Sequence, residues 1–234
     1  MIRVVVLLLI QIDQRSASVT RSSLAAFLFL AMSGSAVWSA EPSFTATFDE
    51  AERPSNWTVN TGHWEPKDGV LVCRELEADN HAAAARLQTP LSDGTVSCRV
   101  KFAGATGFHV GFDPAPGQLK KKGHLFSLVL TPNSVVLKKH RDKADADSKD
   151  ETLATAKLEN TQDWIKVWLV LKGDTVVAEL ENGDQAVRLE ATDPSFHVAK
   201  PTVVFRTIGG DAHLDDVSVT VTKPGLPQAA KPQK

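Results

Sequence analysis

Short stretches in which apolar and polar residues alternate run along the chain from Phe44 to Val221, and Gly, Pro, Asn or Asp separate one stretch from the next. In the stretch from Val96 to Phe102 every second residue is apolar, and serine, arginine and lysine stand between them. Because successive side chains of a strand point to opposite faces, this period of two predicts half-buried β-strands. No helical period separates the stretches, so the pattern predicts antiparallel sheets.

Turn residues between the stretches support this interpretation, because Asp-Gly and Asn-Gly pairs supply the positive φ angles of tight hairpins. The expected turns are Lys67-Asp68-Gly69, Ser92-Asp93-Gly94, Lys172-Gly173-Asp174 and Asn182-Gly183-Asp184. The alanine-rich segment 82–85 is interpreted as a strand, since Pro90 soon ends any helix. We therefore expect an all-β fold, a two-sheet antiparallel β-sandwich or jelly roll, in one domain over residues 41–223.

The first forty residues have a different pattern. Arg15 and Arg21 precede the apolar run Leu24 to Met32, and the small residues Ser33 to Ala36 follow. This order predicts a signal peptide over residues 1–40, cleaved between residues 36 and 40, and an exported, periplasmic or extracellular protein. An uncleaved anchor is the alternative, but the runs are shorter than the roughly 20 residues that cross a bilayer. The Pro-rich tail, residues 224–234, is expected to be disordered.

The charge of the chain limits the classes of function. Lys+Arg total 26 and Asp+Glu 28, so the net charge is −2 and a dedicated nucleic-acid binder is not expected. The sequence has no Gly-x-Ser-x-Gly, His-Glu-x-x-His or Gly-rich phosphate motif, which leaves serine hydrolases, zincins and nucleotide binders without support. We expect a monomer that has no membrane segment once the leader is removed.

The two cysteines, Cys73 and Cys98, both lie in predicted strands. In an exported protein we expect them to form a disulfide, whose closed loop of about 25 residues would stabilise the fold by roughly 3 to 4 kcal/mol. Two buried free thiols are the alternative, because cysteine is a common core residue.

Two stretches of sequence carry a family resemblance: one from Phe48 through Trp57 to Leu71, and one from Gly209 to Val219 that contains Leu214-Asp215-Asp216-Val217. Together they resemble the concanavalin A-like lectin and glucanase superfamily, near the laminin G-like jelly rolls and the 3-keto-disaccharide hydrolase-like domains. The resemblance implies two curved sheets, with carbohydrate often bound on the concave face or at the loops of one edge. It supports the fold more than any activity.

Glucanases of this superfamily carry three carboxylates on one strand face, because a retaining glycosidase needs two carboxyl groups only about 5 Å apart. The segment Glu75-Leu76-Glu77-Ala78-Asp79 is the nearest match, but its spacing departs from the family's Glu-x-Asp-x-x-Glu. A solvated strand end is the favoured interpretation, and no catalytic residue is predicted.

A candidate ligand face follows from strand parity. If Phe108 and Phe112 face the core, His109 and Asp113 face outward, and the preceding strand places Arg99 outward as well. Arg206, which precedes the Gly209-Gly210 turn, is expected on the same face. A sheet face with Arg99, His109, Asp113 and Arg206 suits hydroxyl-rich or acidic sugars through charge-assisted hydrogen bonds. Ordinary solvent-facing residues are the alternative.

Two further sites are candidates. Trp64 lies beside the Gly62-His63 turn and is either a platform for a sugar ring or a hydrophobic plug, whereas Trp164 and Trp168 are expected to be structural. In modules that the sequence resembles, acids of the paired terminal strands hold a structural Ca²⁺, and such acids here are Asp49, Glu50, Asp215 and Asp216. The alternative is that the aspartates cap backbone N–H groups.

These observations predict an exported, lectin-like carbohydrate-binding domain. A glycoside hydrolase of the 3-keto-disaccharide hydrolase type and a structural or adhesive module with a protein partner are the alternatives. An acid pair at glycosidase separation would favour the enzyme, an exposed tryptophan beside polar residues would favour glycan binding, and a broad apolar patch would favour a protein partner.

Overall fold

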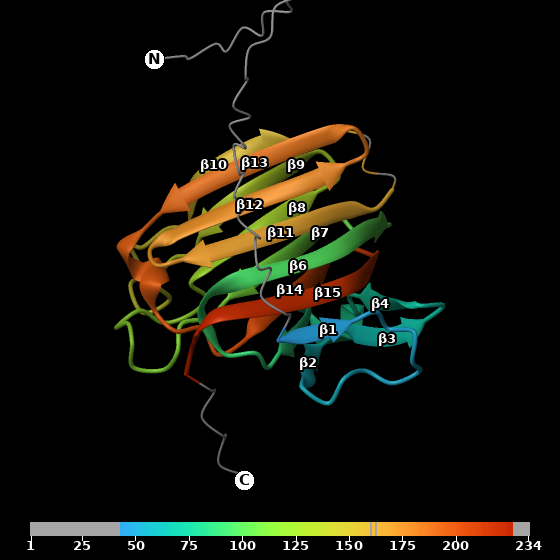
Figure 1. Cartoon of the computed structure of the whole chain (residues 1–234), viewed down its shortest axis with the longest axis horizontal. Helices are drawn as coiled ribbons and strands as arrows, with labels where there is room; N and C mark the ends of the chain where they lie inside the picture. Colours follow the sequence, from blue (N-terminus) through green and yellow to red (C-terminus); the bar gives the residue numbers. More distant parts are fainter. Residues whose placement is uncertain (1–42, 160, 162, 227–234) are drawn as a thin grey trace, which may run out of the picture. The chain divides into compact units, whose positions relative to one another are not determined.

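The computed structural model describes residues 43–226 except 160 and 162 (Figure 1). The predicted leader and residues 227–234 of the predicted tail lie outside the described residues. Within the described part the strands and 3₁₀ helices are β1 (Phe44–Ala46), β2 (Trp57–Thr61), β3 (His63–Lys67), β4 (Val70–Arg74), η1 (Glu77–Asp79), β5 (Ala83–Leu87), β6 (Leu91–Ala103), β7 (Gly107–Phe112), β8 (Phe126–Thr131), β9 (Ser134–Lys139), β10 (Glu151–Lys157), β11 (Ile165–Lys172), β12 (Thr175–Asn182), β13 (Gln185–Thr192), η2 (Pro194–His197), β14 (Val203–Ile208) and β15 (Asp211–Pro224).

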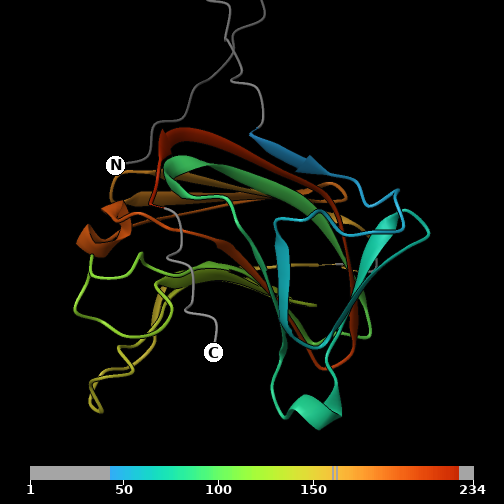
Figure 2. The ribbon, with the colours of Figure 1, turned by 90° about the horizontal axis from the view of Figure 1, so that it is seen from below.

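The strands form two antiparallel sheets. Sheet A has the order β13-β12-β11-β6-β15-β4-β3, with β1 also paired to β15, and sheet B has the order β10-β9-β8-β7-β14-β5-β2. Figure 1 shows sheet A in front of sheet B, and Figure 2 shows the two layers from the side. The predicted two-sheet antiparallel sandwich is confirmed.

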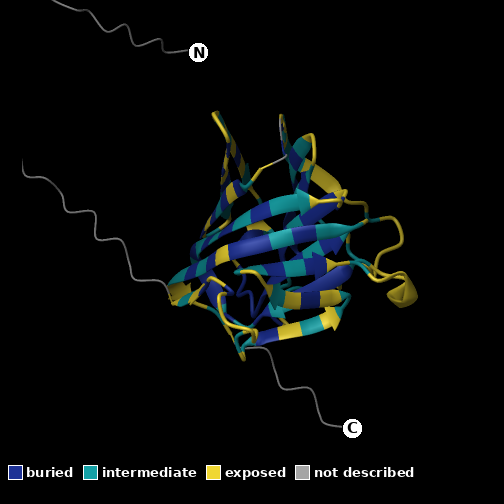
Figure 3. Cartoon of the chain, turned by 90° about the vertical axis from the view of Figure 1, so that its right-hand side faces the viewer, coloured by how far each residue is buried: buried dark blue, intermediate teal, exposed yellow. Residues whose placement is uncertain are grey.

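The core fills the space between the two sheets. On β7 the side chains of Phe108, Val110 and Phe112 are fully buried, whereas His109 between them is half-buried. Phe126 of β8 packs with Phe112 at a ring distance of 5.0 Å. Figure 3 shows buried and more exposed positions alternating along the strands. The period of two in the sequence is therefore the inside-outside alternation of a sandwich.

Three of the four predicted turns show two different structural roles of glycine. Gly173 and Gly183 have φ angles of 60° and 58° and stand in the turns after β11 and β12, as predicted. Ser92-Asp93-Gly94 is not a turn but part of the long strand β6. A Cβ atom at Gly94 would clash with the carbonyl oxygen of Thr220, so glycine is required there for close approach of two backbones rather than for a turn.

Cys73 and Cys98 are both free and buried, so the predicted disulfide is wrong. Cys73 is on β4 and Cys98 on β6, and β15 lies between these strands. Strands two places apart are separated by about 10 Å, whereas the Cα atoms of a disulfide lie less than about 7 Å apart. Burial raises the pKa of the Cys98 thiol to about 12, which leaves the thiol protonated and unreactive.

Candidate functional site

The outward face of sheet B, defined as the face turned away from sheet A, presents a compact set of polar side chains at its centre. On β14 Arg206 lies directly opposite Ala84 of β5 and His109 of β7. Two residues earlier, Val204 lies opposite Arg86 and Gly111. Three adjacent strands thus place two arginines and a histidine on one face, with Ala84 beside Arg206 and Gly111 beside Val204.

A pocket of ≈ 530 Å³ lies on this face. Its walls come from segments that extend beyond sheet B in Figure 2. One wall is the segment that contains η1, and the other is formed by the segments 113–125 and 140–150. Its lining residues are Asn60, Thr61, His81, Ala84, Arg86, Asp113, Gly123, His124, Lys143, Val204 and Arg206. A pocket of this size falls in the range of small-ligand sites.

Small residues keep part of this face open. Ala84 lies beside Arg206, and Gly111 lies beside Val204 and Ser127. A Cβ atom at Gly111 would clash with the hydroxyl of Ser127, so no side chain fits there. The face is therefore open beside Ala84, which lines the pocket, whereas the Ser127 hydroxyl fills the space beside Gly111.

Asp113, the one carboxylate among the lining residues, is fully engaged. One of its oxygens lies 2.5 Å from His124 Nδ1 and the other accepts a hydrogen bond of 3.2 Å from Arg86, which also donates to Asn60. Burial raises the pKa of Asp113, but the hydrogen bond from His124 and the charge of Arg86 outweigh it and hold the pKa below its usual value. Asp113 is therefore an ionised anchor for Arg86 and His124.

Arg206 and His109 have no such partners. Arg206 makes no hydrogen bond or ion pair to any described residue, and its Nε is buried, as is the unpartnered Nδ1 of His109. Burial lowers the pKa of Arg206, and the neighbouring charge of Arg86 lowers it further. Burial, followed by the charge of Arg206, lowers the pKa of His109 to about 3, so this imidazole is neutral at pH 7. The pair offers one free guanidinium and one neutral ring.

A second polar group borders the pocket on the side of β8 and β9. Ser127 Oγ lies 2.8 Å from His140 Nε2, and the His140 ring lies 5.5 Å from that of His124. Burial lowers the pKa of His140 to about 4, with His124 contributing in the same direction and Asp150 opposing it. This group holds a neutral imidazole in a fixed orientation beside the pocket.

The structure brings three of the four predicted face residues together and separates the fourth. His109, Asp113 and Arg206 share the outward face of sheet B, but Arg99 lies on β6 in sheet A. The expectation that Arg99 belongs with them is wrong, because the chain crosses from one sheet to the other between β6 and β7. Arg99 instead binds Asp215 at 2.6 Å and Asp216 at 2.7 Å.

The structure decides between the two interpretations of Trp64. Trp64 is only 2% exposed, and its indole N–H donates to the Thr61 carbonyl at 3.0 Å, so it is a core residue and not a sugar platform. Trp168 is half-buried, and its parity on β11 places it on the outward face of sheet A rather than in the core. Trp164 stacks against the Arg99 guanidinium at 5.0 Å.

The proposed calcium ligands do not form a cluster. The terminal strands do pair, since Ala46 lies opposite Val217, but Asp215 and Asp216 are both bound to Arg99. Asp216, with a φ of 47°, lies in the β15 bulge, and its N–H bonds the Asp215 carboxylate at 2.7 Å. Within residues 43–226, apart from 160 and 162, no group of three or more His, Cys, Asp or Glu could hold a metal ion. Asp49 and Glu50 therefore do not complete a site with this pair.

The acidic segment 75–79 is a strand end, as favoured from its spacing. Its residues 77–79 form η1, and Glu75 accepts a hydrogen bond of 2.6 Å from the Gly209 N–H. None of its carboxylates lines the pocket. The segment holds the β14–β15 turn and is not a catalytic strand.

Sequence reasoning missed Arg86, Asn60 and His124. Arg86 follows three consecutive alanines on β5, so no apolar-polar alternation marks its face, and nothing in the sequence shows that β5 pairs with β14. His124 lies in a connecting segment, where parity does not apply, and Asn60 lies in β2 where its register with β5 shifts. Only the sheet order brings these residues to Arg206.

Another pocket, of ≈ 560 Å³, lies near β2 and β3. Its arginine, Arg53, already donates to the Trp64 carbonyl, and its His63 and Glu65 bind each other at 3.1 Å. Because these polar groups are paired, the pocket on sheet B is the better candidate for a ligand site.

No protein-family model matches the chain, and no curated protein matches it. Among solved structures, it is similar to the carbohydrate-binding module CBM66 from Bacillus subtilis, with 15% identity over 70% of this chain and 94% of that one and a TM-score of 0.53. A Bacteroides ovatus mixed linkage glucan GH16 protein in complex with a product gives 12% identity, 76% and 99% coverage and a TM-score of 0.56.

The CBM2 module of the evolved Dit of Lactobacillus casei BL23 phage J-1 gives 13% identity, 77% and 95% coverage and a TM-score of 0.55. At such identities these likenesses show the fold, and they confirm the concanavalin A-like jelly roll implied by the sequence resemblance. Proteins with this fold include both glycan-binding modules and glycoside hydrolases. No helix in the described part of the chain is long and apolar enough to cross a membrane.

Proposed function

We propose that this protein is an exported carbohydrate-binding domain whose ligand occupies the pocket on the outward face of sheet B. The observation that carries the proposal is the pocket itself: two arginines, two histidines, an asparagine and an aspartate surround a floor kept open by Ala84. Such fixed donors and acceptors suit the hydroxyl groups of a sugar. The carbohydrate-binding modules among the similar structures support the same assignment.

Binding is favoured over hydrolysis by the number of carboxylates. A retaining glycosidase needs two carboxyl groups about 5 Å apart, and an inverting one needs two that are further separated. Of the residues that line the pocket, Asp113 alone has a carboxylate, and it is bound by Arg86 and His124. The lining has no second carboxyl group. A general acid needs a carboxyl group with a raised pKa, whereas the pKa of Asp113 is lowered.

A protein partner is less well supported. The exposed large apolar residues in the described part are Leu76, Val170 and Leu226, which come from three separate segments: the residues before η1, strand β11 and the residues after β15. Isolated apolar residues are normal on protein surfaces and do not form an interaction patch.

A glycan array probed with the secreted protein tests the proposal. Ala84→Phe fills the pocket and should abolish the array signals, whereas Val170→Phe places the same ring on the outward face of sheet A and should leave them unchanged. Circular dichroism spectra and melting curves establish that both variants fold. A wild-type protein without any array signal, or equal binding by both variants, would contradict the assignment to this pocket.

Export is part of the proposal and has its own test. The mass of the secreted protein should place its first residue between positions 37 and 41, after removal of the predicted leader. Retention of Leu24 to Met32 in the secreted form would show that the leader is not cleaved.

A further inference from the structure

Arg206 is held in place by the sheet and not by a charged partner. Its backbone is paired on both sides, with Ala84 of β5 and His109 of β7, and its side chain lines the pocket. No described residue accepts a hydrogen bond from its guanidinium, and the buried Nε has no partner. An unpaired, partly desolvated guanidinium raises the free energy of the unliganded protein, and an anion bound there would offset that cost.

Positive charges outnumber negative ones in the lining of the pocket. Arg86, Arg206 and Lys143 line it, and Asp113 is the only acidic lining residue. The Asp113 carboxylate is already hydrogen-bonded to Arg86 and His124. It and Glu75 act on Arg206 only through space, where their charges oppose the lowering of the Arg206 pKa by burial and by Arg86. Lys143, which comes from the segment 140–150, also has no ion-pair partner among the described side chains, and its stem lies against Gly123.

We infer that the ligand of this pocket is an acidic sugar, one that carries a carboxylate or a sulfate ester, and that Arg206 binds its anionic group. The inference rests on the proposed function and narrows the class of ligand. Guanidinium groups bind carboxylate and sulfate oxygens through two parallel N–H donors, which gives orientation as well as affinity. Lys143, which also lines the pocket, would contribute a further positive charge.

The neighbours of Arg206 suit the rest of such a ligand. Ala84 has no side chain beyond Cβ, so a ring can lie beside the guanidinium on that side. On the other side Arg206 packs beside the neutral imidazole of His109, whose Nδ1 is buried and does not line the pocket. Arg86 is held by Asn60 and Asp113 and has fewer donors free than Arg206.

The test compares matched sugars with and without charge. The probes are trigalacturonic acid, galactotriose, which has the same rings without carboxylates, and a sulfated galactose oligosaccharide. Each is titrated into the secreted wild-type protein and into Arg206→Met, Arg206→Lys and Arg188→Met by isothermal calorimetry. Arg188→Met removes one positive charge from the outward face of sheet A, where Arg188 is 55% exposed, and so controls for net charge.

Wild-type protein should bind one of the two acidic probes at least tenfold more tightly than galactotriose, and the preferred probe distinguishes carboxylate from sulfate. Arg206→Met should lower that affinity about 10- to 100-fold, the usual loss of a charge-assisted hydrogen bond pair, and Arg188→Met less than twofold. Arg206→Lys keeps the positive charge but loses the two parallel N–H donors of the guanidinium, so its affinity should lie between those of Arg206→Met and the wild type. Rising NaCl should weaken wild-type binding of the acidic probe, a measurement that needs no variant.

The failures of the inference and of the proposed function are distinguishable. Array binding to neutral glycans alone, unaffected by Arg206→Met, would overturn the acidic-sugar inference and leave the carbohydrate-binding function standing. Equal losses from Arg206→Met and Arg188→Met would also overturn it, because only net charge would then matter. A wild-type protein that binds no glycan on the array or in solution would overturn both.

Discussion

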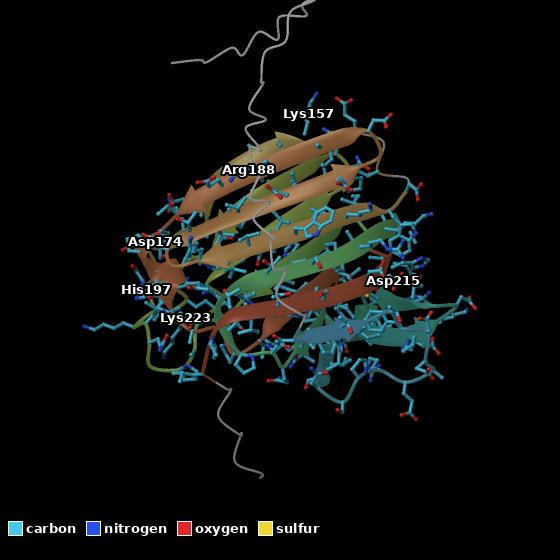
Figure 4. All side chains as sticks on the ribbon, viewed as in Figure 1. Lys157, Asp174, Arg188, His197, Asp215 and Lys223 are labelled. Atoms are coloured by element: carbon cyan, nitrogen blue, oxygen red, sulfur yellow. The ribbon has the colours of Figure 1, made fainter. Side chains whose placement is uncertain are left out.

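The outward faces of the two sheets are both formed by strands with alternating apolar and polar residues. They differ in how their charged side chains are paired. On sheet A, Arg99 binds Asp215 and Asp216, Lys166 binds Glu181 at 3.1 Å, and Arg188 lies between two glutamates, Glu179 and Glu190. Figure 4 shows Arg188 on β13 and Asp215 on β15, both on this face. On sheet B, Arg206 lies in a pocket without a partner.

This difference separates a face that maintains the fold from a face that is open to a ligand. Charges that satisfy one another in the unliganded protein have little left to offer a sugar. A charge that is half-buried and unpaired has a cost in the unliganded state that binding can recover. The unpaired Arg206, rather than the number of charges, is the reason for proposing sheet B as the binding face.

The largest expected effect is an acid sensitivity that originates on sheet B. Because the folded pKa of His140 is lowered to about 4 and the unfolded value is near 6.5, the unfolded chain binds a proton that the folded chain does not between these pH values. Stability should therefore fall as pH drops from about 6.5 to 4, by about 3 kcal/mol for this residue. His109, with a pKa of about 3, acts in the same direction.

Urea denaturation of wild type and His140→Gln at pH 7.0 and 4.5 measures this effect. The variant should lose less stability on acidification than the wild type, while His213→Gln on β15 of sheet A should behave like the wild type. An identical loss in all three proteins would assign the acid sensitivity to other groups.

The second effect compares one arginine from each face. Arg99→Met should destabilise the protein by about 2 kcal/mol, because it leaves the buried Asp215 carboxylate, 5% exposed, without its charge partner. Arg206→Met removes a half-buried guanidinium that has no hydrogen-bond partner, so it should not lower the free energy of unfolding. Chemical denaturation at pH 7 measures both, and equal losses would make Arg206 a structural residue.

A smaller effect is expected from Asp113→Asn. The folded pKa of Asp113 is lowered, so its carboxylate stabilises the protein at pH values above about 3.8, the unfolded value, and this contribution is lost as the pH falls through the folded pKa. Asp113→Asn should cost about 1 kcal/mol at pH 7. The difference from wild type should shrink below pH 3.8; a constant difference across this range would show that the loss is steric and not electrostatic.

The smallest effect concerns the inner side of sheet A. Because Cys73 and Cys98 are free and buried, reductant should leave the melting temperature unchanged. A thiol reagent should modify neither cysteine in the folded protein and both after denaturation. A drop in melting temperature with reductant would indicate a disulfide and a shift in the β4–β15–β6 register.

The sequence was sufficient for the local features of this protein. The period of two identified most strands and assigned their inner and outer residues, so that His109, Asp113 and Arg206 were correctly placed outside the core. It could do so because the alternation of a strand depends only on the chain's own backbone geometry. β10, whose seven residues are exposed or half-buried, has little apolar contrast and was missed.

Which strands are neighbours depends on the path of the whole chain, and no local pattern encodes it. The change of sheet between β6 and β7 separates Arg99 from His109, and β15, which lies between β4 and β6, keeps Cys73 and Cys98 apart. The pairing of β5 with β14 brings Arg86 to Arg206. The pairings of β15 with β4 and β6, and of β5 with β14, join residues more than a hundred positions apart. They form because this strand order lets the two sheets bury their apolar faces against each other.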